Sequence, residues 1–369
     1  MKARRWDVRS GSRQAVRLAD LAQLVRAPAA LSVPGDILAG AAAAGRPLSG
    51  PTLGVMGSSV CLYWAGMALN DYADATIDAV ERPERPVPSG RVPRGTALAV
   101  AGALTAAGLG LAAASGGRRS LLAALPLTGV IWAYDLKLKS TPAGAAAMAS
   151  ARTLDVLSGA LAAARPGGTG RALLRGAVPA ALVGAHTYTL SALSRHEISG
   201  APARVPASTL AAATTTALAT ALPAVRTAIV SARAGTAEPS RGRTATAAAQ
   251  RYLGSHPTTR SATTRSATTR SATTRSATTR SATTRSAATR AAVVGAGALA
   301  YLGTYGAAQI RALREPSGEN VRRAVGAGIL GFLPLQTALT ARSGATVAAA
   351  ALGVAHPLAR RLARRVSPT

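Results

Sequence analysis

The chain has 369 residues, of which 48% are hydrophobic and only 15% are charged, well below the roughly 25% charged residues of an ordinary soluble domain. Of the charged residues, 43 are basic and 14 are acidic, which gives a formal net charge of +29 at pH 7. This composition argues against a soluble domain with a mixed-charge surface, and the single Cys61 excludes a disulfide framework and a cysteine-based zinc site.

Apolar segments long enough to cross a bilayer, which takes about 20 residues, recur along the chain. We predict spans at residues 22–44, 51–70, 96–115, 119–134, 142–164, 172–194, 208–232, 291–312 and 323–342. A shorter apolar segment at 345–358 would add a tenth span. The sequence therefore predicts an all-α polytopic membrane protein, built as a bundle of nine or ten transmembrane helices.

The placement of Lys and Arg predicts the orientation in the cell membrane, because basic residues in short loops concentrate on the cytoplasmic side. The N-terminal arm and the loops at 71–95 and 135–141 are basic and fall on one side of the predicted spans. We therefore expect a cytoplasmic N-terminus and a cytoplasmic polar cap. The predicted organisation is a basic arm at 1–20, helices one to seven with the cap at 21–232, an insertion at 233–290, the remaining helices at 291–358 and a basic tail at 359–369.

Five exact copies of Ser-Ala-Thr-Thr-Arg fill residues 261–285. Arginine at every fifth position matches neither the helical nor the strand period, so no apolar face forms. A Thr-rich basic segment is typical of disorder, and we predict a disordered low-complexity insertion between two spans. The repeat has no aromatic residue for base stacking, so we expect no nucleic-acid partner. The alternative to a passive linker is contact with anionic lipid through arginine.

Acidic residues gather directly after the second predicted span. Five of the 14 acids lie within 14 residues: Asp71, Asp74, Asp78, Glu81 and Glu84. On a helix, Asn70, Asp71, Asp74 and Asp78 share one face. Like charges on one face repel, but Mg²⁺ among them would make the arrangement favourable, since it prefers oxygen ligands and substrate phosphates. The alternative is a solvated polar helix end, although acids at the membrane edge are costly and usually functional.

Lysine is rare in this chain, and two of its three lysines follow the fourth predicted span in the segment Tyr134-Asp135-Leu136-Lys137-Leu138-Lys139. Compact ammonium groups there would hold a diphosphate as point charges. The alternative is ordinary positive-inside anchoring of a cytoplasmic loop. An acidic metal site on the same side favours the diphosphate interpretation.

These motifs resemble a known family. Asn70-Asp71-x-x-Asp74-x-x-x-Asp78, followed by the segment 81–90, resembles the first aspartate-rich motif of the UbiA superfamily of membrane prenyltransferases. The segment 134–139 resembles the tyrosine- and lysine-containing loop after the fourth helix of that family, and Leu24-Val25-Arg26-Ala27-Pro28 also fits. The resemblance implies a nine-helix bundle, Mg²⁺, an isoprenyl diphosphate donor and a lipid-accessible tunnel for its tail.

One departure from the family pattern lies at the end of the sixth span. Most members carry a second aspartate-rich motif there, whereas this chain has Ser194-Arg195-His196-Glu197. This ending, with the terminal residues 366–369, is similar to the EboC-like branch of the family. The resemblance then implies that Glu197 would ligate a metal and that Arg195 would bind phosphate.

The implied reaction is the ionisation of an allylic diphosphate and capture of the cation by an unidentified acceptor. The resemblance assigns catalysis and Mg²⁺ binding to Asp71, Asp74 and Asp78, with Asn70 in support. The substrate-binding residues would further include Tyr134, Lys137, Lys139, Arg82 and Arg85. The alternatives are a non-catalytic membrane protein or cation-coupled transporter of the same fold, and a terpene cyclase of the UbiA type.

Two intramembrane acids stand apart from this motif. Asp36 and Asp155 would line the cavity. The alternative for Asp155 is a structural ion pair with Arg152, three residues earlier on the same helix face.

Overall fold

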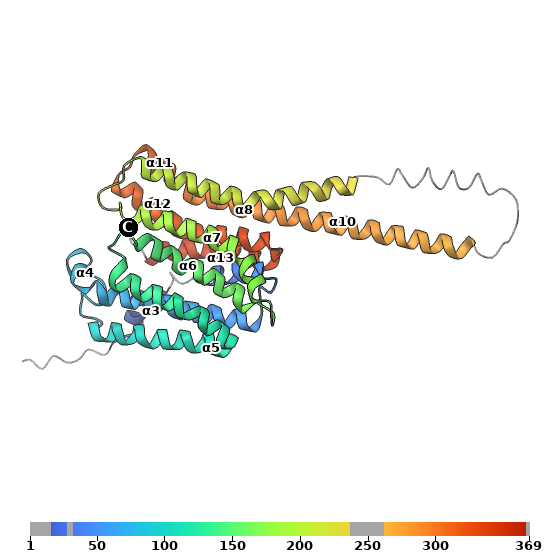
Figure 1. Cartoon of the computed structure of the whole chain (residues 1–369). Coiled ribbons are helices and arrows are strands. Elements are labelled where there is room, and N and C mark those ends of the chain that lie inside the picture. The colour runs from blue at the N-terminus through green and yellow to red at the C-terminus, as the bar shows by residue number, and fades with distance from the viewer. Residues whose placement is uncertain (1–15, 28–31, 237–261, 367–369) are drawn as a thin grey trace, which may run out of the picture. The chain divides into compact units, whose positions relative to one another are not determined.

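The computed structural model describes residues 16–27, 32–236 and 262–366, and within these ranges the regular elements are all helical (Figure 1). The predicted all-α fold is therefore confirmed. The chain divides into two compact units, one made of Met1–Ala192 with Ala359–Thr369 and the other of Leu193–Leu358.

Five helical segments within the described residues are long and apolar enough to cross a membrane: Gly50–Ala73, Arg94–Leu138, Arg204–Ala234, Ala282–Arg314 and Gly318–Arg342. Shorter apolar helices cover Val33–Ala43 and Thr346–Pro357. The count of nine or ten spans stays a prediction.

The first predicted span, 22–44, is not one helix. Helix α1 (Leu18–Leu24) is separated from α2 (Val33–Ala43), and between them Arg26 adopts the left-handed region with φ 45°. Pro34 lies in the first turn of α2, where its fixed φ and missing N–H suit a helix start rather than a helix interior. The break places the charged side chain of Arg26 beside the end of another helix, as described below.

One helix of the first unit folds back on itself as a helical hairpin. Helix α5 (Arg94–Ala133) contains one non-helical residue, Gly117, with φ 61° and ψ −154°. The indole N–H of Trp132 donates to the hydroxyl of Thr105 at 3.1 Å, although 27 residues of straight helix would separate them by about 40 Å. The chain therefore turns back at Gly117, so the segments 96–115 and 119–134 lie in two separate helical arms, and their role as two membrane spans stays a prediction.

Close backbone contacts through glycine pack the helices of this unit. A Cβ on Gly159 of α6 (Gly144–Ala162) would lie 2.1 Å from the carbonyl oxygen of Ile37 in α2. A Cβ on Gly184 of α7 (Thr169–Ser194) would lie 2.3 Å from the hydroxyl of Thr153. Small residues that let backbones approach are the usual contacts between membrane helices, since lipid provides little hydrophobic force between them.

The interior of the first unit holds charged side chains. The Nε of Arg152 lies 2.8 Å from the Oδ2 of Asp36, and the two side chains are 5% and 0% exposed. The hydroxyl of Ser59 donates to the carboxylate of Asp155, which is also fully buried. The structure thus pairs Arg152 with Asp36 on another helix, α2, because the close α2–α6 contact brings this acid within reach.

The second unit contains α8 (Arg204–Thr236), α10 (Ala262–Tyr301), the π-helical turn η3 (Leu302–Gly306), α11 (Ala307–Arg314) and α12 (Gly318–Arg342), and most of α13 (Thr346–Val366) belongs to it. Its core is small-residue packing around Val294, with Ala224 from α8 and Ala338 from α12. Helix α13 shows that the apolar segment at 345–358 is helical.

The repeat is helical in the structure, which corrects the prediction of a disordered insertion for the part of 233–290 that is described. Helix α8 continues to Thr236, and α10 begins at Ala262 and includes almost all of the repeat. Figure 1 shows α10 running beside α8 and continuing past its end. The repeat lacks Gly and Pro and precedes an apolar helix, so it extends a helix that packing already stabilises. Residues 237–261 lie outside the described part.

Candidate functional site

The acidic motif lies at the C-terminal end of α3 (Gly50–Ala73). This helix stops at Ala73, and Asp74, with φ −90° and ψ 5°, joins it to the short helix α4 (Ala75–Glu81). The helical face predicted over residues 70–78 is thus interrupted at one residue. Asp71 and Asp78 still lie on a common side, because Arg85 contacts both of them.

Two arginines neutralise the buried acids of this motif. Arg26 donates to Asp71 at 2.8 Å. Arg85 lies 3.5 Å from the same carboxylate and 2.6 Å from that of Asp78. Asp71 and Asp78 are 1% and 2% exposed. A buried carboxylate without a partner is strongly unfavourable, so the two arginines are what allows two acids to be buried at this helix end.

The third acid pairs with the predicted lysine loop. The Nζ of Lys139 lies 2.5 Å from the Oδ1 of Asp74. This loop begins as the π-helical turn η2 (Tyr134–Leu138), in which the backbone N–H of Lys139 donates to the carbonyl of Tyr134 at 3.0 Å. π-helical turns inside helices are frequent at functional sites. The structure therefore brings the two predicted motifs together through a salt bridge.

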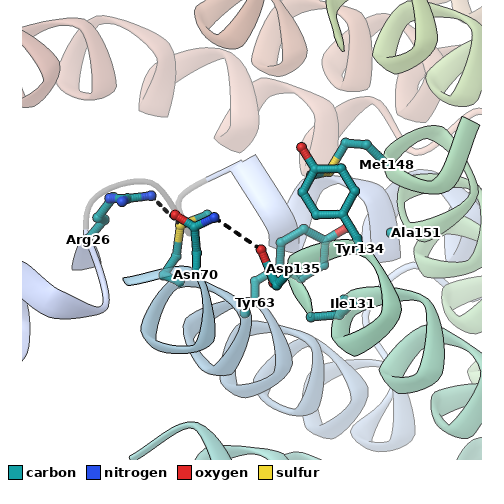
Figure 2. Close-up of a pocket in the computed structure, with 10 residues that line it drawn as sticks. Arg26, Tyr63, Asn70, Ile131, Tyr134, Asp135, Met148 and Ala151 are labelled. Carbon is teal, nitrogen blue, oxygen red and sulfur yellow. Dashed lines mark hydrogen bonds between the residues drawn. The ribbon is translucent and has the colours of Figure 1, made fainter. Parts of the chain in front are cut away.

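A cavity of about 210 Å³ lies beside these ion pairs. Figure 2 shows Arg26 and Asn70 facing it from one side and Tyr134 and Asp135 from the other. The side-chain amide of Asn70 donates to the carboxylate of Asp135 at 3.3 Å. The remainder of the lining is mostly apolar: Tyr63, Gly66, Met67, Ile131, Met148 and Ala151. The cavity is therefore polar at the end of α3 and apolar toward the interior of the unit.

Asn70 and Tyr134 are the predicted site residues that line this cavity. The neighbouring ion pairs are formed by the other predicted residues of the two motifs, Asp71, Asp74, Asp78, Arg85 and Lys139. Four further predicted residues lie elsewhere. Arg82 and Lys137 are exposed. Arg195 and Glu197 belong to the second unit, where the backbone carbonyl of Glu197 accepts a hydrogen bond from Arg322 at 2.9 Å. Substrate binding by these four residues stays a prediction.

Two residues of the site were missed from the sequence as ligand-binding groups. Arg26 is an isolated basic residue in an otherwise apolar stretch, and Asp135 is an acid between two predicted binding residues. An unpaired charge next to an apolar segment is costly, so a search for the partner of each isolated charge could have found both. The partners are distant in sequence, at Asp71 and Asn70.

The donor chemistry of the site fits magnesium. Asn70, Asp71, Asp74, Asp78 and Asp135 offer hard oxygen ligands, without the sulfur or imidazole donors that softer metals prefer. In the part of the chain that is described, no three His, Cys, Asp or Glu residues gather closely enough to share one ion. The carboxylates are instead held by Arg26, Arg85 and Lys139, and the joint role of the three aspartates as metal ligands stays a prediction.

Comparison with known families decides the classification. A model of the UbiA prenyltransferase family matches residues 34–237, more than half of the chain. The chain belongs to the UbiA prenyltransferase family. Together with the apolar helices, this confirms a multi-pass membrane protein. The match covers the aspartate motif, the lysine loop and the helices that carry them.

Related sequences carry one recurring name. Digeranylgeranylglyceryl phosphate synthase of Methanopyrus kandleri is 40% identical over 111 residues, which are 30% of this chain and 38% of that protein. The protein of the same name from Ignicoccus hospitalis is 36% identical over 154 residues, which are 42% of this chain and 50% of that protein. The chain thus spans half or less of the length of these two curated relatives. Membership of the EboC-like branch stays a prediction.

Solved structures share the fold of this UbiA family member. A structure of digeranylgeranylglyceryl phosphate synthase has a TM-score of 0.51 and 14% identity, and the match covers 89% of this chain and 99% of that one. A UbiA homolog from Aeropyrum pernix has a TM-score of 0.50 and 17% identity, with 82% and 94% covered. These likenesses support the predicted UbiA-type helical bundle.

Proposed function

We propose that this protein is a membrane prenyltransferase that binds an isoprenyl diphosphate at the end of α3 and transfers its prenyl group to an acceptor. One observation carries the proposal: Arg26, Arg85 and Lys139 gather with the acidic motif beside a cavity whose inner wall is apolar. A prenyl diphosphate has the same division into a charged head and an apolar tail. The helix end would take the head, and the interior of the first unit would take the tail.

The basic residues supply the electrostatic part of the mechanism. When the bond between the first carbon of the prenyl chain and the diphosphate oxygen breaks, its electron pair leaves with the pyrophosphate, and negative charge grows on that group. Arg26, Arg85 and Lys139 lie where they would neutralise it, and preorganised charges of this kind usually contribute more to catalysis than any other single effect. The carboxylates that hold these cations fix their positions before the donor binds.

Magnesium is part of the proposal. Asp71, Asp74 and Asp78 would hold it, with Asn70 in support and Asp135 as an additional oxygen donor. When bound, the ion would supply Lewis-acid stabilisation of the departing pyrophosphate. The same carboxylates pair with Arg26, Arg85 and Lys139, so we expect the metal to take the carboxylates when the diphosphate takes the cations, and metal and donor to bind together.

The acceptor is suggested by the relatives. Their name describes a glyceryl phosphate that carries two geranylgeranyl groups, so the acceptor proposed for this chain is a glycerol phosphate that carries one prenyl chain. In the transfer, the acceptor hydroxyl oxygen would form the new bond to the first carbon of the donor and would pass its proton to the departing pyrophosphate. The apolar wall near Tyr63 and Met148 would keep water, the competing nucleophile, away from the cation.

The proposal is tested with the full-length protein in lipid nanodiscs. Geranylgeranyl diphosphate is supplied with Mg²⁺, with and without geranylgeranylglyceryl phosphate, and both pyrophosphate release and product mass are measured. A product heavier than the acceptor by one prenyl group supports the proposal. Pyrophosphate release with a cyclic hydrocarbon and no adduct would point to a terpene cyclase. Absence of release under all these conditions would favour a non-catalytic or transport role.

A further inference from the structure

A second cavity lies at the opposite end of the first unit from the aspartates. It has a volume of about 740 Å³ and is lined by the loop that leads into α3 and by the connection from α6 to α7. Helix α3 begins at Gly50, next to this cavity, and ends at Ala73, next to the acidic motif. Its 24 residues separate the two sites by about 36 Å at 1.5 Å per residue.

The lining of this second cavity carries one sign of charge. Four arginines, Arg46, Arg165, Arg171 and Arg175, contribute to it, and the remaining lining residues are Ala44, Gly45, Ala164, Pro166, Gly167, Gly168 and Ala172. The helices and loops that meet here come from sequence segments without acids: residues 37–70, 86–134 and 156–196 contain no Asp or Glu. Four arginines around one cavity repel each other, and the lining provides no carboxylate to offset that repulsion.

Backbone turns shape the two loops that line this cavity. Gly45 and Gly167 have φ values of 91° and 72°, which are left-handed conformations that turn the two loops. The backbone N–H of Gly168 donates to the carbonyl of Arg165 at 3.0 Å. Arg119 donates from Nη1 to the carbonyl of Ala164 at 3.2 Å and so ties the α6–α7 connection to α5. The cavity is therefore bounded by two closed turns rather than by long side chains alone.

The start of α7 adds to the positive potential. This helix has 26 residues and begins at Thr169, directly at the cavity. The first turn of a helix presents N–H groups without intrahelical acceptors, and the helix dipole is positive at that end. Arg171 and Arg175 extend from the same first turns and are one helical turn apart, so both lie on the cavity side.

We infer that this cavity, which we call the arginine cavity, binds the phosphate group of an anionic membrane phospholipid. An anion fits this lining, because it would offset four like charges, and guanidinium groups favour phosphate oxygens. The cavity also lies at the end of a helix that is long and apolar enough to span the bilayer, and this is the depth at which phospholipid head groups lie. A head group therefore reaches the arginines without leaving the membrane.

Ordinary membrane anchoring does not account for these arginines. If the aspartate end is cytoplasmic, as the sequence predicts, the arginine cavity faces the other side, where positive residues are disfavoured rather than selected. A bound anionic lipid would account for four arginines on that side. The inference does not depend on the proposed prenyl transfer, because none of these arginines lines the cavity near Asp135.

The test titrates the detergent-purified full-length protein with dioleoylphosphatidylglycerol and follows the midpoint of thermal unfolding. Dioleoylphosphatidylcholine and inorganic phosphate serve as separate arms. The variant Arg165→Gln/Arg171→Gln/Arg175→Gln should raise the half-saturating concentration of phosphatidylglycerol at least ~10-fold, as expected for lost charge-assisted contacts. The charge-matched control Arg226→Gln/Arg311→Gln/Arg314→Gln, at exposed positions of the second unit, should stay within about twofold of the wild type.

Several outcomes would overturn the inference. Equal losses in the two triple variants would show that only net charge matters, and no loss in either would show that the arginines bind no lipid. Saturation by inorganic phosphate with no additional effect of phosphatidylglycerol would assign the cavity to a soluble phosphate. If the triple variant does not fold, Arg171→Lys provides the test: it keeps the charge but loses the planar fork, and it should still weaken phosphatidylglycerol binding. Unchanged binding in that variant would count against a built phosphate site.

Discussion

The two ends of the first unit differ in how their charges are balanced. At the end of α3, Asp71, Asp74 and Asp78 are each paired with Arg26, Arg85 or Lys139. At the start of α3, four arginines line a cavity whose lining contains no acid. Charges of both signs suit a ligand that also carries both signs, such as a diphosphate with its metal ion. Charges of one sign suit a simple anion.

The difference also explains why only one end is proposed to be catalytic. Preorganised charges accelerate a reaction only if they are fixed before charge develops, and the carboxylates at the end of α3 fix their three cations. In the arginine cavity the cations are exposed, and the lining contains no carboxylate that would fix them. Four changes to the chain would break or sharpen this comparison.

The largest expected effect comes from Asp74→Ala. It removes the partner of Lys139 and a proposed metal ligand, and we expect prenyl transfer to fall at least ~10²-fold, on the scale of losing one electrostatic stabiliser. Turnover is measured in nanodiscs with insertion checked by gel filtration and circular dichroism. The control is Glu319→Ala, which removes an exposed acid from a surface pair in the second unit. Wild-type turnover in Asp74→Ala would remove this acid from the proposed site.

The next effect concerns the close contact between α2 and α6 in the first unit. A Cβ at Gly159 would meet the backbone of Ile37 at 2.1 Å, so Gly159→Ala should force α2 and α6 apart and destabilise the fold by about 1–3 kcal/mol. The matched control is Gly110→Ala, since a Cβ there meets nothing within 4 Å. Thermal unfolding of both variants gives the comparison. Equal unfolding temperatures would mean that the close contact does not hold the unit together.

A smaller effect separates phosphate binding from membrane anchoring at Lys139. Lys139→Gln should raise the Michaelis constant for the donor by about tenfold, as expected for one lost charge-assisted contact. Lys139→Arg keeps the charge but replaces a compact ammonium with a broader group, and we expect a smaller rise. Both variants should insert normally. Wild-type constants in both would mean that this loop touches no diphosphate, and the site would then rest on Arg26 and Arg85.

The smallest effect is expected from deleting the repeat, residues 261–285. Its 25 residues amount to about seven turns at 3.6 residues per turn, so the deletion removes the start of α10 and leaves the apolar part that follows the repeat. The contacts that are lost include the hydrogen bond from the hydroxyl of Thr284 to the carbonyl of Ser231 in α8 at 3.3 Å. Turnover and unfolding temperature should stay close to the wild type. A large loss of activity that anionic lipid restores would instead indicate electrostatic docking.

Sequence patterns predicted well what depends on local order along the chain. The apolar segments, the acid spacing around Asp74 and the turn at Gly117 can each be identified within one stretch of residues. Contacts between distant segments could not be predicted in the same way. Arg26 reaches Asp71, 45 positions later, because the chain leaves the helix before α2, and the sequence predicted one continuous span there. Arg152 similarly selects Asp36 on another helix.

The prediction for the repeat failed for a different reason. Its composition and period lack an apolar face, and for an isolated segment this favours disorder. In the structure the segment continues a helix whose apolar end packs around Val294. Once such a helix exists, each further residue adds one hydrogen bond without a new nucleation step. This helical extension depends on packing outside the repeat, so the pattern of the repeat alone does not predict it.

The central claim, that the aspartate end binds the donor with its metal ion, is tested most directly by equilibrium binding of an unreactive thiolo analogue of geranylgeranyl diphosphate. Its affinity is measured with Mg²⁺ and with chelator for the wild type, Asp74→Ala and Arg171→Gln/Arg175→Gln. We predict that Mg²⁺ strengthens binding at least ~10-fold in the wild type and in the arginine variant. In Asp74→Ala this gain should nearly disappear, since removing a carboxylate weakens metal-dependent binding but not binding of the anion alone. A full Mg²⁺ gain in Asp74→Ala, or its loss in the arginine variant, would contradict the account.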